Sequence, residues 1–117
     1  MLSTSVVVLD FETTGLSPRG GDRITEVAAL RVRDGRVVDR YVTLVNAGVR
    51  IPSFITGLTG ITNDMVASAP PARRVIRELV EFLADDLVVA HNAGFDHGFL
   101  TAECDRAGLT TREYRTL

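Results

Sequence analysis

Four consecutive apolar residues, Val6–Leu9, constrain the fold of this chain more than any other stretch. Three of the four are β-branched, and a short uninterrupted run of this kind is typical of a strand that is buried on both faces. Such a strand lies inside a sheet, so we expect a neighbouring strand on each side of it. Asp10 follows the run directly and Glu12 comes two residues later. The sequence therefore places two carboxylates at the end of a buried strand.

The rest of the hydrophobic pattern predicts an α/β fold with a mixed sheet. Asp34-Gly35 separates two strand-like runs and suits a tight hairpin, because both central positions of that turn need a positive φ. Helical spacing of apolar residues then alternates with one more short apolar run. This order favours an antiparallel three-strand meander, a helical crossover and a fourth strand parallel to the first. We expect strands at 4–12, 23–33, 36–45 and 87–91, helices at 75–83 and 93–107, and an irregular or briefly helical segment at 52–62.

The second expected strand carries apolar residues on alternate positions. We expect Ile24, Ala28, Leu30 and Val32 to lie on one face of this strand.

The composition limits the class of protein. A chain of 117 residues fits one domain, and a hydrophobic share of 45% with 24% charged residues is ordinary for a folded globular protein. The net charge of −2 argues against a broad basic surface for nucleic acid, but it allows a nuclease that grips a few nucleotides. A single cysteine, Cys104, cannot form an internal disulfide, so we expect a reducing, cytoplasmic setting. The apolar run near the start is too short for a membrane span, and no membrane association is expected.

A third carboxylate occupies a position comparable to that of the first two. Asp10 and Glu12 point to the same side of a strand, roughly 6–7 Å apart, and they repel each other. Asp96 comes just after another short apolar strand, near the start of a helix. Solvated acids at a strand end and an acid favoured by the helix dipole are the simpler interpretations. Both patterns in one chain favour a shared site, where a hard divalent cation such as Mg²⁺ or Mn²⁺ would turn repulsion into attraction.

Four separated stretches, in order, carry a resemblance to a known family. "DFETTGL", "RITEVAAL", "IPSFITGLTGITNDMV" and "VAHNAGFDHGFL" resemble the DEDD superfamily of 3′–5′ exonucleases, in the DEDDh branch that includes the proofreading epsilon subunit of bacterial DNA polymerase III. The resemblance implies a ribonuclease H-like fold and two bound Mg²⁺ or Mn²⁺ ions. It implies hydrolysis of the terminal phosphodiester at a single-stranded 3′ end of DNA or RNA. A DNA polymerase, or another replication or repair protein, is the implied partner.

The same resemblance assigns roles to individual residues. It implies that three carboxylates ligate the metal ions, that four residues line the pocket for the terminal nucleotide, and that one amide braces the loop before the last helix. These residues are Asp10, Glu12 and Asp96 for the metal, Thr13, Thr14, Leu16 and Thr59 for the pocket, and Asn92 for the loop.

One element of the family pattern is missing. The family carries a third motif, His-x-Ala-x-x-Asp, on a last helix, which supplies the general base and a further metal ligand. "HNAGFD" at 91–96 spells this motif, but it overlaps the second motif and would require Asp96 to occupy two places. We therefore expect residues 1–117 to form a single exonuclease-like domain that lacks the last strand and helix. Such a domain would be weakly active or inactive alone and could self-associate through uncovered apolar surface. The alternative is a non-catalytic remnant of the same fold that binds nucleic acid or protein.

Overall fold

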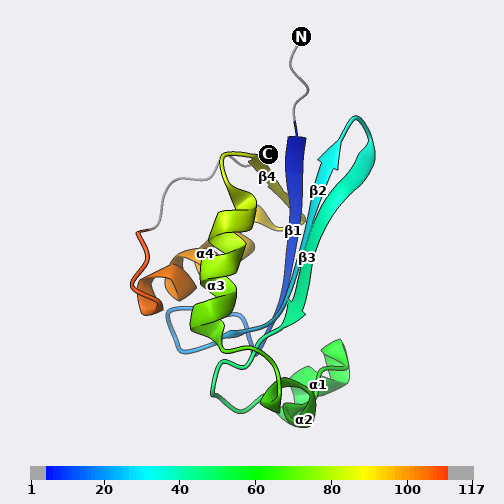
Figure 1. The fold of residues 1–117 in the computed structure, drawn as a ribbon. Helices are drawn as coiled ribbons and strands as arrows, with labels where there is room; N and C mark the ends of the chain where they lie inside the picture. Colours follow the sequence, from blue (N-terminus) through cyan, green and yellow to red (C-terminus); the bar gives the residue numbers. More distant parts are fainter. Residues whose placement is uncertain (1–4, 111–117) are drawn as a thin grey trace.

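The computed structural model describes residues 5–110 and contains one four-stranded sheet. The strands are β1 (Ser5–Thr13), β2 (Ile24–Arg33), β3 (Arg36–Leu44) and β4 (Leu87–Ala90). They lie in the order β3-β2-β1-β4, with β1–β2 and β2–β3 antiparallel and β1–β4 parallel (Figure 1). The expected mixed sheet, its meander and the interior place of the first strand are therefore confirmed. Asp34 and Gly35 have φ of 53° and 74°, as the predicted hairpin requires.

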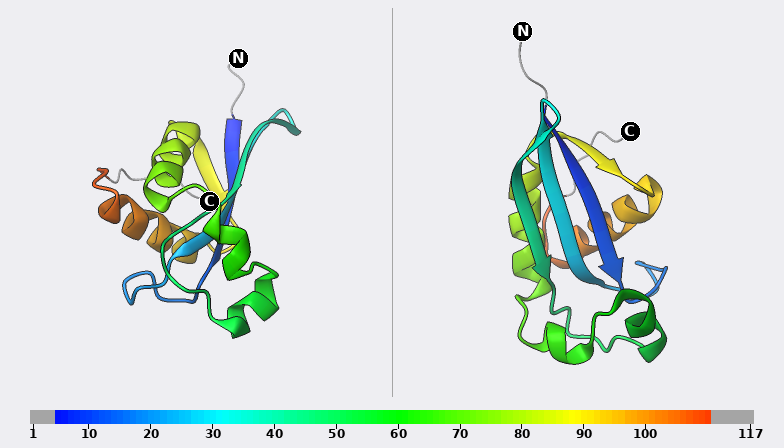
Figure 2. Two further views of the ribbon diagram at one scale, coloured as in Figure 1. Left: turned by 60° about the horizontal axis from the view of Figure 1, so that its bottom comes forward. Right: turned by 90° about the vertical axis from the view of Figure 1, so that its right-hand side faces the viewer.

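Two longer helices cover one face of the sheet, and two short helices lie beyond one end of it. The four are α1 (Ser53–Thr59), α2 (Asn63–Ala67), α3 (Ala72–Leu83) and α4 (Ala93–Arg106). In Figures 1 and 2, α3 and α4 pack on the same side, whereas α1 and α2 lie near the end of β1 that carries the acidic residues. The segment expected to be irregular or briefly helical contains α1. Within the described residues, no helix is long and apolar enough to cross a bilayer.

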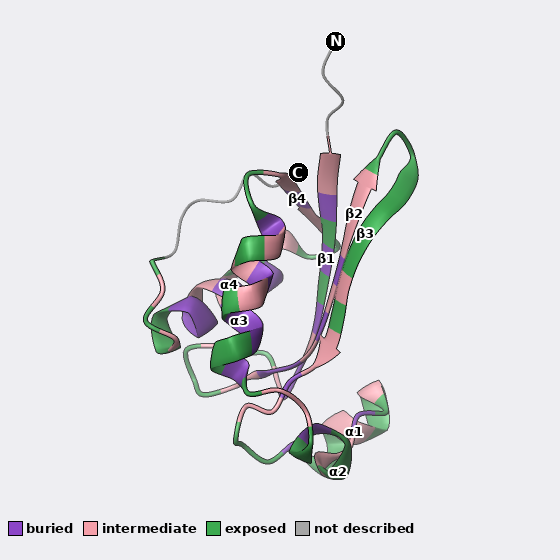
Figure 3. Cartoon of the chain, viewed as in Figure 1, coloured by how far each residue is buried: buried purple, intermediate pink, exposed green. Residues whose placement is uncertain are grey.

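The core lies between the sheet and the α3–α4 layer. Along β1, Val7, Leu9 and Phe11 are buried against the helices, whereas Val8 points the other way and is 40% exposed. Figure 3 shows the same alternation along the strand. The expectation that β1 is buried on both faces is therefore wrong for the described residues. The strand lies inside the sheet, but helices cover only one of its faces.

The four apolar residues of β2 that were expected to lie on one face do not all do so. The deeply buried residues are Val27 and Ala29, not Ala28, Leu30 and Val32. Ile24 is buried and so lies apart from the other three, because the pairing with β1 shifts register between Glu12 and Thr13. That irregularity moves the first residue of β2 to the opposite side from the one that strict alternation would give it.

A buried ion pair ties the loop before β2 to α4. The Nε and Nη2 atoms of Arg23 donate to the two carboxylate oxygens of Glu103 at 2.9 and 2.8 Å, and the backbone N–H of Ile24 adds a bond at 3.3 Å. The Glu103 side chain is 2% exposed and that of Arg23 is 17% exposed. The carboxylate raises the pKa of Arg23, mainly through the hydrogen bond. No motif in the sequence pointed to Glu103, whose burial arises from contacts between distant segments.

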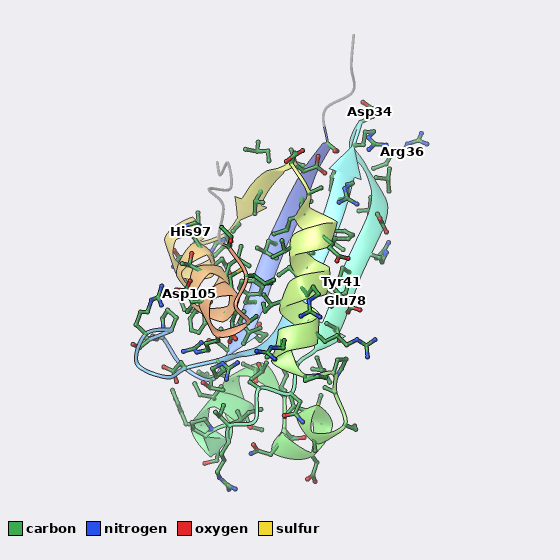
Figure 4. All side chains as sticks on the ribbon, turned by 60° about the vertical axis from the view of Figure 1, so that its left-hand side comes forward. Asp34, Arg36, Tyr41, Glu78, His97 and Asp105 are labelled. Atoms are coloured by element: carbon green, nitrogen blue, oxygen red, sulfur yellow. The ribbon has the colours of Figure 1, made fainter. Side chains whose placement is uncertain are left out.

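A second set of polar contacts holds β2 and β3 against α3. The Arg31 guanidinium lies over the Phe82 ring, 4.2 Å from its centroid, and pairs with Asp86 at 2.9 Å. The Tyr41 hydroxyl donates to Glu78 at 2.9 Å, and Figure 4 shows the two side chains together. Burial and this carboxylate raise the pKa of Tyr41.

Candidate active site

Two of the acidic residues stand at the end of β1, on the face away from the helices. Asp10 pairs with Ala28 and Glu12 with Glu26, which leaves both carboxylates on the side opposite Leu9 and Phe11. Burial raises the pKa of Glu12, and the negative charges of Asp10 and Glu26 raise it further. The end of this strand therefore concentrates negative charge.

Asp96 reaches the same region from α4. The helix begins after Asn92, whose side chain accepts a hydrogen bond from the N–H of Phe95 at 3.5 Å. Asp96 lies in the first turn, is only 3% exposed, and its Oδ1 has no hydrogen-bond partner among residues 5–110. Burial raises its pKa to about 6, and the charge of Asp10 contributes to that rise. The carboxylates of Glu12 on β1 and Asp96 on α4 thus both lie within electrostatic reach of Asp10.

The donor chemistry of these carboxylates suits a hard divalent cation. They are oxygen ligands, they repel one another, and one buried oxygen lacks a partner, which are conditions that a Mg²⁺ or Mn²⁺ ion would relieve. In the part of the chain that the structure describes, no three acidic, histidine or cysteine side chains are close enough to form a finished metal site. The three acidic residues therefore lie in one region, but their side chains do not converge as the ligands of a metal ion would.

A cavity of about 410 Å³ opens beside Glu12. The end of β1 and the following loop form one wall, which includes Thr13 and Leu16, and α1 forms the other, which includes Phe54 and Thr59. Three of the residues expected at a nucleotide pocket, Thr13, Leu16 and Thr59, thus lie together. The expectation placed them at one site from separate motifs, and the tertiary structure brings them to one cavity.

Thr14 does not line this cavity, which differs from the expectation. Its hydroxyl donates to Asp22 Oδ1 at 3.0 Å and accepts from the Arg23 N–H at 3.0 Å, so it is buried inside the loop. A Cβ atom at position 15 would lie only 2.4 Å from the Asp22 carboxylate, which accounts for the glycine at this position. Thr14 therefore braces the loop that carries the pocket residues. Asn92 caps α4, consistent with the bracing role expected for it.

Five apolar residues of the cavity were not anticipated, namely Phe11, Phe54, Ile55, Leu58 and Phe95. Phe54 and Leu58 project from α1 and are among the most exposed large hydrophobic residues, while Phe95 comes from the start of α4 and packs on Phe99. The sequence did contain a signal for Phe54 and Leu58, since they are apolar residues four apart in a segment with helical character. Their exposure, rather than their spacing, marks them as a contact surface.

The two histidines differ in their surroundings. His91 follows β4, and its electrostatic interaction with Asp96 lowers the pKa of that carboxyl. His97 is exposed on α4, with its ring 3.5 Å from the Thr101 hydroxyl. Neither lies on a separate helix of the kind that the family's third motif would occupy.

Comparison with known proteins gives consistent matches over most of the chain. The family model described as "Exonuclease" (RNase_T) matches residues 7–113. The 3'-5' exonuclease DinG of Bacillus subtilis is 42% identical over 103 residues, which are 88% of this chain and 11% of that protein. A PolC-type DNA polymerase III of Caldanaerobacter subterraneus is 42% identical over 109 residues, which are 93% of this chain and 8% of that protein. The chain thus spans about a tenth of the length of these relatives.

Solved structures with the same arrangement of elements include exonuclease I. One such structure, in complex with an inhibitor, superposes with a TM-score of 0.86 at 15% identity and covers 100% of this chain and 28% of that one. Another, E. coli exonuclease I in complex with a dT13 oligonucleotide, gives a TM-score of 0.84 at 16% identity and covers 97% of this chain and 27% of that one. These likenesses establish a ribonuclease H-like fold.

Proposed function

This chain belongs to the exonuclease family matched over residues 7–113, and we propose that its acidic site is the metal-dependent centre of a 3′–5′ exonuclease. The family consists of hydrolases, and the DEDD type follows from the relatives. The observation that supports the metal centre best is Asp96, a buried carboxylate with an unpartnered oxygen beside the charge of Asp10. A buried acid in this state is costly unless it serves a bound cation or proton.

Asp10, Glu12 and Asp96 would hold the divalent ions, two in this class of mechanism. Bound there, the ions activate a water and stabilise the leaving oxygen of the terminal phosphodiester. The chain's own contribution is positional, because β1 and α4 deliver the carboxylates from rigid elements. Low solvent access at Asp96 strengthens its interaction with a cation.

The cavity beside Glu12 would receive the 3′-terminal nucleotide. Its volume of about 410 Å³ is within the range of small-molecule sites. The exposed Phe54 ring offers a surface on which a base can stack, and such stacking tolerates any base. This arrangement suits removal of nucleotides from a single-stranded 3′ end, in DNA or RNA. A polymerase or another repair or replication protein is the proposed partner, in keeping with the PolC-type relative.

We propose in addition that the general base and a fourth acidic ligand come from outside residues 5–110. The described histidines follow β4 or lie on the exposed side of α4, and the described acids do not close around a metal. A positioned base contributes about 10²–10⁴-fold to rate. A centre without that base should therefore trim DNA far more slowly than one that has it, and exposed outer-sheet residues such as Val8 could support self-association.

The test combines metal binding with cleavage. In a thermal melt, Mn²⁺ or Mg²⁺ should raise the Tm, since a ligand that binds only the folded state stabilises it. Asp10→Ala should remove this rise, and Glu81→Ala, an exposed acid on α3, is the matched control that should keep it. Cleavage is followed on a 3′-labelled single strand with Mn²⁺.

The outcomes separate the alternatives. Metal stabilisation with slow, Asp10-dependent trimming supports the exonuclease. Metal stabilisation without any trimming fits both an exonuclease domain that lacks its base and a non-catalytic remnant of the fold, and trimming by the full-length protein then distinguishes the two. Equal melting temperatures with and without metal would mean that the acids are merely solvated, and the proposal would fail.

A further inference from the structure

A small cavity lined by arginines lies at the other end of α4 from the acidic site. It measures about 50 Å³ and is lined by Arg23, Arg73, Arg106, Glu103 and Ala107. The ten residues between Asp96 and Arg106 correspond to roughly 15 Å of helix. In Figure 4, His97 and Asp105 mark the two ends of this helix. The arginine cavity is therefore separate from the proposed metal centre.

Glu103 neutralises only part of the charge in this cavity. Its oxygens already accept two bonds from Arg23 and one from the Ile24 N–H, and Arg106 approaches at 3.5 Å. Three guanidinium groups and one carboxylate leave two formal positive charges in excess.

Two of the arginines are engaged by neighbouring groups, and the third is free to bind a ligand. Arg23 is held by Glu103, while Arg106 lies in the last turn of α4, where the helix dipole favours a cation, and donates to the Pro18 carbonyl at 2.7 Å. The Arg73 side chain is exposed and forms no hydrogen bond or ion pair with any residue between 5 and 110, so its donors are free to meet a ligand. It is the second residue of α3, whose first turn contains no acid. A cation at the positive end of a helix is unfavourable by itself.

We propose that this cavity binds a phosphate group, held by Arg73 and Arg106 with support from Arg23. A tetrahedral oxyanion would balance the excess charge and accept charge-assisted bonds from the guanidinium forks. It would also meet the positive end of the α3 dipole. The space of about 50 Å³ suits one phosphate-sized group and is too small for a nucleoside. The phosphate is either free inorganic phosphate or a backbone phosphate of a nucleic-acid strand.

The experiment measures the Tm of the chain in EDTA, with sodium phosphate or sodium chloride at matched ionic strength. Phosphate at ten times its Kd should raise the Tm by roughly 5 °C. Arg73→Ala should weaken phosphate binding by about tenfold or more, because it removes the unpaired cation. Arg77→Ala is the matched control, since Arg77 is an exposed arginine one turn further along α3 and outside the cavity lining.

A second arm identifies the source of the phosphate. Oligonucleotide affinity is measured by fluorescence anisotropy in EDTA for the same variants, with inorganic phosphate as competitor. Competition together with weaker binding in Arg73→Ala assigns the site to a nucleic-acid strand, and phosphate binding without either effect assigns it to free phosphate. Absence of a phosphate-specific rise in Tm overturns the proposal. The proposal is also overturned if phosphate raises the Tm of the Arg73→Ala variant as much as it raises the Tm of the Arg77→Ala variant.

Discussion

The ion pair between Arg23 and Glu103 should be among the most sensitive points in the fold. Arg23→Ala leaves a carboxylate that is 2% exposed with only the Ile24 N–H at 3.3 Å and Arg106 at 3.5 Å. Loss of one partner from a buried pair costs about 3–5 kcal/mol. That is a large part of the roughly 5–15 kcal/mol by which domains are stable.

Removal of Glu103 should reduce the free energy of unfolding by less than removal of Arg23. Glu103→Ala leaves a guanidinium that is 17% exposed and still donates to the Ala47 carbonyl at 3.1 Å, so water and that carbonyl can satisfy it in part. We expect a loss of about 1.5–3 kcal/mol, the range for a hydrogen bond to a charged group. The doubly substituted Arg23→Met/Glu103→Met chain removes both charges and keeps apolar volume, so it should lose less than Arg23→Ala.

The assay is urea unfolding followed by far-ultraviolet circular dichroism, with the free energy of unfolding extrapolated to water. If the loss of the double variant Arg23→Ala/Glu103→Ala equals the sum of the losses of the two single alanine variants, the pair does not act as a unit. A smaller loss for Arg23→Ala than for Glu103→Ala would refute the argument from burial.

Three further perturbations test the site. Because the folded pKa of Asp96 is raised from 3.8 to about 6, its contribution to stability is present below pH 4 and is lost as the pH rises through 6. Without metal, the Asp96→Asn variant should therefore be more stable than the parent, by up to about 3 kcal/mol at pH 7.5 and by little at pH 4. Denaturation curves at the two pH values measure this difference. The same variant should lose the rise in Tm with Mn²⁺. Thr14→Val should cost about 1–2 kcal/mol, since it removes the bonds to Asp22 and the Arg23 N–H, and a Tm unchanged from the parent would contradict the loop-bracing role. Phe54→Ala should leave the Tm unchanged and raise the KM for a single strand roughly tenfold, whereas an unchanged KM would remove the stacking role.

Features that depend on neighbouring residues in the chain could be predicted well. The Asp34-Gly35 turn, the strand after α3 and the helix that ends before Gly108 all follow from local spacing and local backbone preference. The order of these elements then restricts the sheet to few arrangements, because a helical crossover returns a strand parallel to the first. The acids of the candidate site were identifiable for the same reason, since each one follows a short apolar run within its own motif.

The remaining features depend on contacts between segments that are distant in the sequence. The register shift opposite Thr13 puts Ile24 on the core side of β2, and periodicity within β2 contains no trace of it. Glu103 is buried only because Arg23, eighty residues away, meets it. The raised pKa of Asp96 needs both burial and the charge of Asp10. Burial and electrostatics are properties of the assembled fold, so the sequence by itself determined the elements and the acidic residues, and the tertiary structure decided their exposure and charge environment.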